Sequence, residues 1–227
     1  MSQSFSSNWL QALPEDLQAA VRVRLTRRVF RDQQLIMRRG ESTNYLFQVA
    51  SGRVRIRAMA GRHKESVFVL YGPTAWFGYF HVFDGGGFAS DAVAEGPTEV
   101  LCLATSDFEA LNAVHPEMMR ALGAQVVYRL RELYEMYLSG QFLSLRAQLA
   151  RQVDFLLSHM ARHSPEHDLQ LDLTQESLAA SVCATRQAVG KVLREWADQG
   201  LVEYGYRSLR VLDREGLRAV GNAESRF

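Results

Sequence analysis

The segment from Leu173 to Leu193 constrains the fold more than any other part of this 227-residue chain. It reads LTQESLAASVCATRQAVGKVL, and its apolar residues recur at helical spacing on both sides of a short break near Cys183. Thr174 and Thr185 stand where a side-chain oxygen can cap the helix that follows. The segment therefore predicts two short helices joined by a tight turn.

The second predicted helix carries polar side chains from its first turn onward. Arg186, Gln187 and Lys191 fall on the side away from the apolar positions. Side chains of these types bond base edges when a helix enters a DNA major groove, and the hydroxyls of Thr174 and Thr185 can bond phosphates. The alternative is an ordinary helical hairpin with a solvated polar face.

The residues around this segment predict a small winged domain. A strong helical pattern from Phe142 to Met160 precedes it, after an expected hinge at Ser139-Gly140. Two strand patterns joined near Arg207 follow it and are typical of a β-hairpin. Because such a wing lies along a phosphate backbone, Arg207 is the expected contact residue.

The N-terminal half has a different pattern. Short helices interrupted at Pro14 come first, and many short strand patterns with glycine turns then run from Val29 to Leu103. This pattern predicts a small antiparallel barrel or jelly roll. The cluster of arginines in this half is interpreted as solvated strand faces, or alternatively as an attraction for an anionic ligand or flanking DNA.

A long helix is expected after Pro116, and it is apolar on two sides. One partner of such a helix would be the barrel, and the other would be the same helix of a second subunit. One predicted stripe, an approximate a/d seam, is interrupted by Arg129 and contains Met119, Leu122, Val126, Leu133 and Met136. The opposite stripe includes Met118, Ala121, Leu130 and Tyr134.

These patterns together predict an α+β chain of three parts. An antiparallel β-barrel domain with N-terminal helices spans 1–114, a long dimerisation helix spans 115–138, and a winged helix-turn-helix domain spans 139–227. The histidines and carboxylates do not pair as metal ligands, and no nucleophile motif stands out, so we expect neither a metal site nor an enzyme.

Composition limits the cellular setting. The net charge of +1 is not that of a non-specific nucleic-acid coater, so any DNA contact must come from a local patch. No apolar run is long enough for a membrane span, and the N-terminus lacks the pattern of a secretory signal, so we expect a cytoplasmic protein. Cys102 and Cys183 lie in apolar periodic segments, which predicts that both are buried free thiols.

The order of barrel, long helix, hinge and winged helix resembles the Crp/Fnr family of bacterial transcription regulators over nearly the whole chain. In the barrel the resemblance rests on Gly40-Glu41, Leu46-Phe47, Ser51-Gly52-Arg53-Val54 and Phe77-Gly78, and near the C-terminus on 173–179, 185–193 and 200–202. It implies a homodimer that binds a roughly palindromic site in double-stranded promoter DNA and contacts RNA polymerase. The recognition helices of the two subunits would sit about 34 Å apart.

The resemblance assigns base reading to Arg186, Gln187 and Lys191. Arg186 suits a bidentate contact with guanine O6 and N7. Gln187 departs from the glutamate that many relatives carry at this position. Because glutamate accepts from cytosine N4 whereas glutamine pairs best with adenine, we expect a changed base preference there.

The same comparison argues against a cyclic nucleotide as effector. Relatives that bind one hold its ribose with an acid and its phosphate with an Arg-Ser pair. Here Tyr79 follows Gly78, and Ala89 precedes Ser90 where the arginine would be. These departures predict that cyclic AMP and cyclic GMP are not the effector. The residues that could line a site for another ligand are Tyr79, Phe88, Ser90, Leu133 and Tyr134.

Other effectors stay open. An iron-sulfur sensor would need an N-terminal cysteine cluster, and a haem sensor would need an axial ligand, for which His63 and His81 are the candidates. Neither group is expected, so the effector is unknown or absent. The alternative function is a signalling module that binds haem or a small anion, with a winged helix that contacts protein. The exposed or buried state of Arg186, Gln187 and Lys191 discriminates the two.

Overall fold

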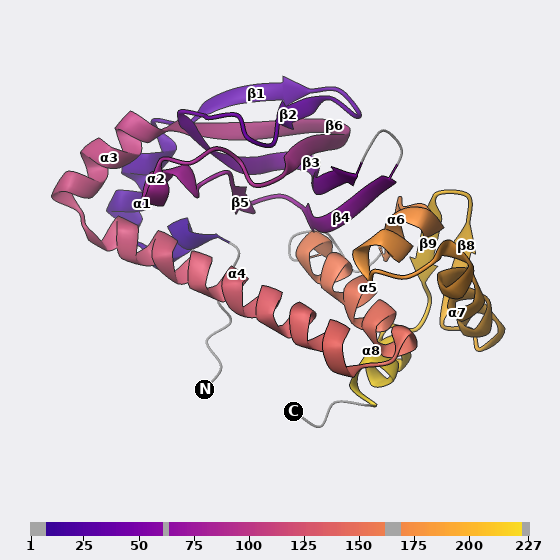
Figure 1. Ribbon diagram of the computed structural model, residues 1–227. Coiled ribbons are helices and arrows are strands. Elements are labelled where there is room, and N and C mark those ends of the chain that lie inside the picture. The colour runs from indigo at the N-terminus through magenta and orange to yellow at the C-terminus, as the bar shows by residue number, and fades with distance from the viewer. Residues whose placement is uncertain (1–7, 61–63, 162–168, 224–227) are drawn as a thin grey trace. The chain divides into compact units, whose positions relative to one another are not determined.

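The computed structural model describes residues 8–60, 64–161 and 169–223 (Figure 1). The chain falls into two compact units, Met1–Arg55 with Tyr71–Glu132 and Ile56–Leu70 with Leu133–Phe227. The predicted domain boundaries after residues 114 and 138 stay a prediction. None of the helices in the described residues is long and apolar enough to cross a membrane.

Two short helices precede the first strand. A 3-10 helix, η1, spans Trp9–Ala12, and α1 spans Glu15–Arg22. Asn8 caps η1, because its Oδ1 accepts a hydrogen bond from the backbone N–H of Leu10 at 3.2 Å. Pro14 lies between the two helices, as the sequence predicts, and stands as the residue before α1.

The strands of the N-terminal half form one six-stranded sheet with the order β1–β6–β3–β4, in which β2 also pairs with β6 and β5 with β3. The pairs of β1 and β2 with β6 and of β5 with β3 are antiparallel, which confirms the predicted sheet type. The bounds are β1 Thr26–Phe30, β2 Leu35–Met37, β3 Tyr45–Ala60, β4 Lys64–Tyr71, β5 Trp76–Phe77 and β6 Asp91–Ala104.

Aromatic side chains fill the core of the first unit. The rings of Trp9 and Trp76 have centroids 5.2 Å apart, and Phe108 meets Trp9 edge-on at 5.8 Å. All three are buried, and each such side chain stabilises the fold by about 1.5–3 kcal/mol. Two helices, α2 (His81–Asp84) and α3 (Thr105–Val114), flank β6 in the sequence, and Phe108 comes from α3.

The long helix, α4, spans Glu117–Phe142 and has two different faces. One face is buried, and it combines the apolar Met118 and Leu122 with the polar Gln125 and Arg129. The other is exposed and apolar, at Val127, Leu130, Leu133, Tyr134 and Tyr137. Each of the two stripes predicted from the sequence therefore combined residues of the buried face with residues of the exposed face. The stripes predicted from the hydrophobic pattern were wrong because three of the buried residues of α4, namely Gln125, Arg129 and Ser139, are polar.

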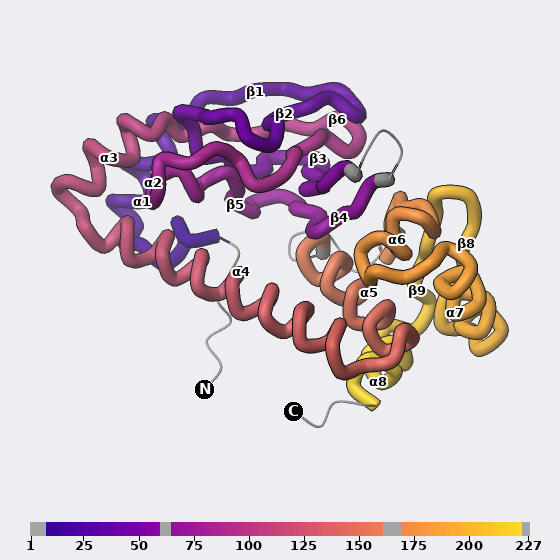
Figure 2. The backbone as a smooth tube through the Cα atoms, in the orientation of Figure 1, coloured from indigo at the N-terminus to yellow at the C-terminus, as the bar shows by residue number. Residues whose placement is uncertain are grey.

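The expected hinge at Ser139-Gly140 was wrong in position. The helix passes through both residues and ends at Phe142, and Leu143 and Ser144 separate it from α5. Figure 2 shows the short bend of the backbone between α4 and α5. A glycine inside a helix costs only about 1 kcal/mol relative to alanine, so it need not end one. The hydroxyl of Ser139 donates to the carbonyl of Glu135 at 2.7 Å within the helix, and it accepts a hydrogen bond from Nη1 of Arg151 at 2.9 Å.

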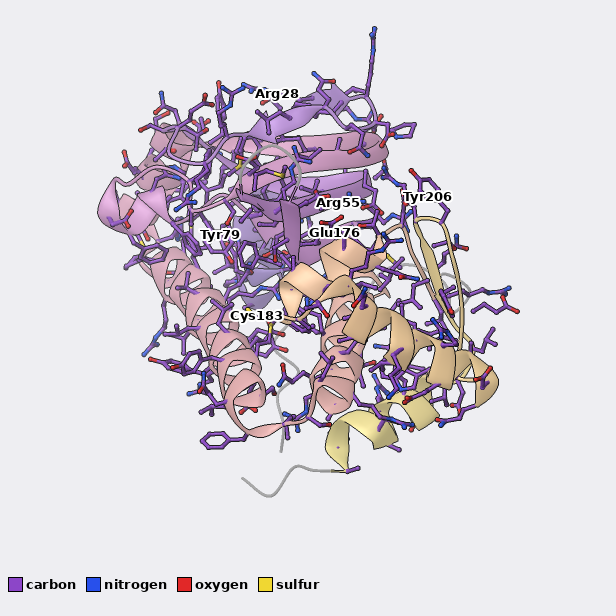
Figure 3. All side chains as sticks on the ribbon, turned by 45° about the vertical axis from the view of Figure 1, so that its right-hand side comes forward. Arg28, Arg55, Tyr79, Glu176, Cys183 and Tyr206 are labelled. Carbon is purple, nitrogen blue, oxygen red and sulfur yellow. The ribbon has the colours of Figure 1, made fainter. Side chains whose placement is uncertain are left out.

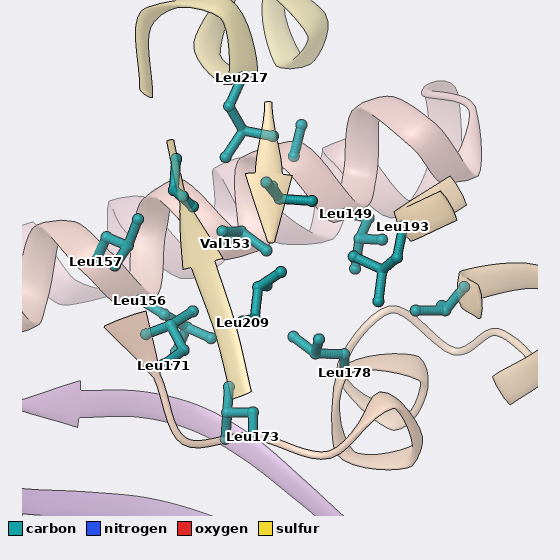
Figure 4. Packing of buried hydrophobic residues seen from close by; sticks show 14 of the residues in the cluster. Leu149, Val153, Leu156, Leu157, Leu171, Leu173, Leu178, Leu193, Leu209 and Leu217 are labelled. Carbon is teal, nitrogen blue, oxygen red and sulfur yellow. The ribbon is translucent and has the colours of Figure 1, made fainter. Parts of the chain in front are cut away.

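The core of the second unit is mainly aliphatic and also contains the buried Trp196. Figure 4 shows part of this core. Leu149, Val153 and Leu156 come from α5, and Leu178, Leu193, Leu209 and Leu217 come from four further elements. A three-stranded sheet has the order β7–β9–β8. The bounds are α5 Leu145–Ala161, β7 Gln170–Leu171, α6 Gln175–Ser181, α7 Arg186–Asp198, β8 Val202–Gly205, β9 Ser208–Val211 and α8 Arg214–Asn222.

Two glycines with a left-handed backbone give a matched test of close packing in the sheet. Gly52 has φ +75°, and a Cβ there would lie 2.4 Å from the carbonyl oxygen of Pro97. Gly40 has φ +82°, but a Cβ there would meet no atom within 4 Å. We expect Gly40→Ala to lower the free energy of unfolding by about 1–2 kcal/mol, which is the left-handed backbone cost alone.

Gly52→Ala should lower the free energy of unfolding by at least about 3 kcal/mol, since the overlap of the new Cβ with the Pro97 carbonyl adds to the cost of the left-handed backbone. Urea unfolding followed by tryptophan fluorescence measures both. Equal losses for the two variants would contradict the close approach of Gly52 to Pro97.

Candidate DNA interface

The first helix of the predicted pair begins where the sequence indicates. The hydroxyl oxygen of Thr174 accepts a hydrogen bond from the backbone N–H of Ser177 at 3.0 Å and so caps α6. Leu178 and Ala179 are buried on the inner face of this short helix. Glu176 stays exposed on the outside (Figure 3).

A four-residue turn, 182–185, separates α6 from α7. Cys183 occupies the left-handed region with φ +52°, and the N–H of Ala184 donates to the carbonyl of Ala179 at 2.9 Å. Thr185 caps α7, with Ala188 N–H as the donor at 3.2 Å. Cys102 is buried as predicted, but the prediction for Cys183 was wrong: its thiol is exposed, because this residue belongs to the turn and not to the apolar face of α6.

The helix α7 separates an apolar face from a polar one. Its buried side chains are Val189, Val192, Leu193 and Trp196. Arg186, Gln187 and Lys191 are all exposed, as the sequence predicts. Arg194 is exposed too and lies on the same face, because it follows Gln187 by seven residues, which is close to two helical turns. The sequence pattern contained this fourth residue, but our prediction stopped one turn earlier.

The hairpin of β8 and β9 forms the wing, and its turn contains Tyr206 and Arg207. Arg207 has φ +54°, and its Nε donates to Oδ1 of Asp172 at 3.3 Å. This hydrogen bond and the carboxylate charge raise the pKa of Arg207. The hydrogen bond thus fixes the guanidinium of Arg207 beside Asp172, which lies two residues before Thr174, the cap of α6. Tyr206 is 93% exposed at the turn (Figure 3). Tyr206 was not predicted as a candidate contact, because a turn pattern does not indicate which of its residues is the most exposed.

The residues predicted to line an effector site lie in different environments. Tyr79 is buried, whereas Phe88 and Ser90 are half-buried. The loop around Phe88 is held by two backbone hydrogen bonds, from Gly40 N–H to the Phe88 carbonyl at 2.8 Å and from Phe88 N–H to the Glu41 carbonyl at 3.1 Å. The other two residues, Leu133 and Tyr134, are exposed on α4.

Tyr79 is bonded to α4. Its phenol forms side-chain hydrogen bonds with Gln125 and Arg129. Burial, and then the neighbouring phenol of Tyr71, raise the pKa of Tyr79 far above its usual value, while those two hydrogen bonds act in the opposite direction. The phenol therefore stays neutral.

The histidines and cysteines do not gather into a metal site in the part of the chain that the structure describes, where no group of three potential ligands occurs. His81 is half-buried, and its Nε2 lies 2.8 Å from the hydroxyl of Thr105. Burial lowers the pKa of His81. His63, the other haem candidate, lies outside the described residues.

Two family models match separate parts of the chain. Residues 27–115 match a cyclic nucleotide-binding domain, and residues 150–220 match a Crp-like helix-turn-helix domain. These ranges contain the six-stranded sheet and the winged unit respectively. The C-terminal match includes both capped helices and the wing.

Relatives of known role match along most of the chain. The CRP-like cAMP-activated global transcriptional regulator of Mycobacterium tuberculosis is 28% identical over 182 residues, which are 78% of this chain and 80% of that protein. The cyclic AMP receptor protein of Thermus thermophilus is 29% identical, over 87% of this chain and 88% of that protein.

The solved structures agree in fold. A CRP/FNR-family transcriptional regulator from Thermus thermophilus superposes with a TM-score of 0.70 at 23% identity, over 88% of this chain and all of that one. FixK2 from Bradyrhizobium japonicum also superposes with a TM-score of 0.70, at 18% identity, over 86% of this chain and 96% of that one.

The six-stranded sheet lies almost entirely in the range of the cyclic nucleotide-binding model, and the capped helix pair with its wing lies in the range of the Crp-like helix-turn-helix model. The predicted fold class and absence of enzymatic function are confirmed. The chain belongs to the Crp/Fnr family of DNA-binding transcription regulators.

Proposed function

We propose that the chain is a homodimeric, sequence-specific regulator that reads a palindromic promoter site with α7 of each subunit. The observation that carries this proposal is the polar face of α7, where Arg186, Gln187 and Lys191 are exposed while the opposite face is buried. Arg186 suits guanine, and Lys191 suits guanine or a phosphate. The caps Thr174 and Thr185 would position the helices on phosphates. RNA polymerase would be a second partner at the promoter.

The wing has a modified role in this proposal. Since Arg207 is bonded to Asp172, it would hold the wing turn beside the start of α6 while it meets the backbone. A DNA contact by this guanidinium would use its remaining N–H groups, because arginine carries five donors.

The exposed face of α4 is proposed as the dimer contact. Val127, Leu130, Tyr134 and Tyr137 follow one another in steps of three and four residues and form one stripe. Each is about half exposed or more in the single chain. A contiguous apolar stripe of this kind is typical of an interface. A second copy related by a two-fold axis would bury this stripe, and a palindromic DNA site requires the same two-fold symmetry.

Cyclic AMP and cyclic GMP are proposed not to act on this chain, although the curated relatives named above are cAMP-activated. Tyr79 supports this view, since its buried phenol is bonded to α4 and carries no charge for a ribose hydroxyl. Ala89 supports it too, because it offers no cation for a phosphate at the place of the expected arginine.

Gln187→Glu should change the base preference of α7. Wild-type protein should select adenine at the base pair that Gln187 faces, and the variant should select cytosine, because glutamate accepts from cytosine N4. Each lost contact should weaken binding by about 1–3 kcal/mol. Selection from random DNA, followed by titration of both sites, measures the change. Gln199→Glu at the far end of α7 is the matched control and should leave the preference unchanged. A wild type that selects cytosine would contradict the assignment.

Leu130→Glu should dissociate the dimer. A carboxylate buried without a partner costs several kcal/mol, so we expect the dimer dissociation constant to rise by at least about 100-fold. Sedimentation velocity measures the oligomeric state. Arg131→Glu, at the next and also exposed position, is the control and should stay dimeric. The stripe is not the interface if both variants sediment as the wild type does.

A further inference from the structure

The turn of the wing leaves an aromatic side chain almost wholly in water. Tyr206 is 93% exposed, and Figure 3 shows it at the tip of the β8–β9 hairpin. Tyr204, two residues earlier on β8, is by contrast half-buried and packs against the core of the second unit. The ring and hydroxyl of Tyr206 therefore lie outside the core and are available to a partner outside the chain.

The backbone of this turn is held in an uncommon conformation. Gly205 pairs with Ser208, so Tyr206 and Arg207 form a two-residue loop. Arg207 has φ +54°, in the left-handed region that residues other than glycine rarely adopt. Its hydrogen bond to Asp172 holds it there, and backbone outliers of this kind cluster at functional sites. The turn therefore presents Tyr206 from a fixed backbone.

The wing turn lies level with the segment that leads from β7 into α6. Leu171 is the last residue of β7 and pairs with Leu209, two residues after Arg207. Gln170 supports the same register, because its side-chain amide donates to the hydroxyl of Ser208 at 3.2 Å. Antiparallel strands advance in opposite directions, so the residues after Leu171 run alongside the wing turn. The turn is thus placed beside the start of α6.

The start of α6 lies in turn against α7. A Cβ on Gly190 would lie 3.3 Å from Oε1 of Gln175, so the first turn of α6 packs closely on the middle of α7. Lys191 follows Gly190 and belongs to the exposed face that is proposed to read bases. Thr174, which caps α6, is expected to bond a phosphate. The wing turn, the cap of α6 and α7 thus form a connected series within the second unit, and DNA that α7 enters would pass beside all three.

The charges of the wing are balanced within the domain. Arg207 is bonded to Asp172, and Nη1 of Arg210 lies 3.8 Å from Oε2 of Glu203. These two arginines and two acids together carry no net charge. Phosphate binding by arginine and lysine is driven by positive charge, through the release of counterions from DNA. A wing with balanced charge gains little from that effect, so a neutral side chain has a larger share in any contact that the wing makes.

We infer that Tyr206 contacts the sugar-phosphate backbone of the DNA that flanks each half-site. Its hydroxyl donates to a phosphate oxygen, and its ring lies on the adjoining deoxyribose. The inference rests on the proposed function and adds a contact outside the bases that α7 reads. Tyrosine hydroxyls are among the groups that bond phosphates in protein–DNA complexes, and a ring with two rotatable bonds loses little conformational freedom on binding. Such a contact positions the protein on DNA of any sequence.

The first test compares two lengths of one operator, which the wild-type full chain selects from random DNA. The long form extends by about 10 base pairs, one helical turn, beyond each half-site, and the short form ends at the half-site edges. Tyr206→Ala should weaken binding of the long form by about 10-fold, because each of two subunits loses a contact. Tyr206→Phe keeps the ring and should lose less. Both variants should bind the short form as the wild type does. Fluorescence anisotropy titration measures each Kd.

The second test repeats the titrations over a range of salt concentrations. A neutral side chain releases no counterions, so the slope of the logarithm of affinity against the logarithm of salt concentration should be equal for Tyr206→Ala and the wild type. Lys191→Ala removes a cation from the interface and should make the slope shallower. A shallower slope in Tyr206→Ala would mean that a displaced cation causes its loss of affinity, and would overturn the inference.

Leu212→Ala is the matched control, because Leu212 is also exposed but follows the far end of β9. It should bind both lengths of the operator as the wild type does. The contact is refuted if Tyr206→Ala binds the long form with wild-type affinity, or if it loses equally on both lengths. Those outcomes leave the proposed function intact. A wild type that selects no DNA sequence would overturn the proposed function together with the inference.

Discussion

The helix α4 has to satisfy two opposite faces at once, and this constraint organises the chain. Its inner face joins the first unit through Met118, Leu122, Gln125 and Arg129, and the cation buried there contacts the Tyr71 ring and the Glu132 carboxylate. Its outer face leaves an apolar stripe without cover in the single chain.

The capped helix pair could be predicted in detail because its signals are local. A threonine oxygen three residues before a backbone N–H forms a cap wherever the chain turns into a helix, and Thr174 and Thr185 both do so. The exposure of Arg186, Gln187 and Lys191 followed from helical period alone. The bonding of Arg207 to Asp172 could not be predicted, since it joins residues 35 positions apart.

The errors share a physical cause, which is that tertiary partners are invisible in a hydrophobic pattern. Arg129 looked like an interruption of an apolar seam, yet it lies on the buried face, where the Tyr71 ring stands 5.1 Å from its guanidinium carbon and Glu132 accepts a hydrogen bond from its Nη1. The helix continues from its predicted end at residue 138 to Phe142, since a glycine inside a helix carries only a small propensity penalty. Tyr79 lies between β5 and α2, and the residues that its phenol bonds come from a helix far along the chain.

The sizes of the residues in the exposed stripe of α4 have a geometric consequence. Interaxial distances between packed helices depend on the side chains at the contact. Val127 and Leu130 are compact, whereas Tyr134 and Tyr137 are bulky and carry hydroxyls that remain wet at a rim. If two copies pair along this stripe, their axes would lie close together near Val127 and diverge toward Tyr137. The pair would therefore form a wedge that widens toward the turn into α5.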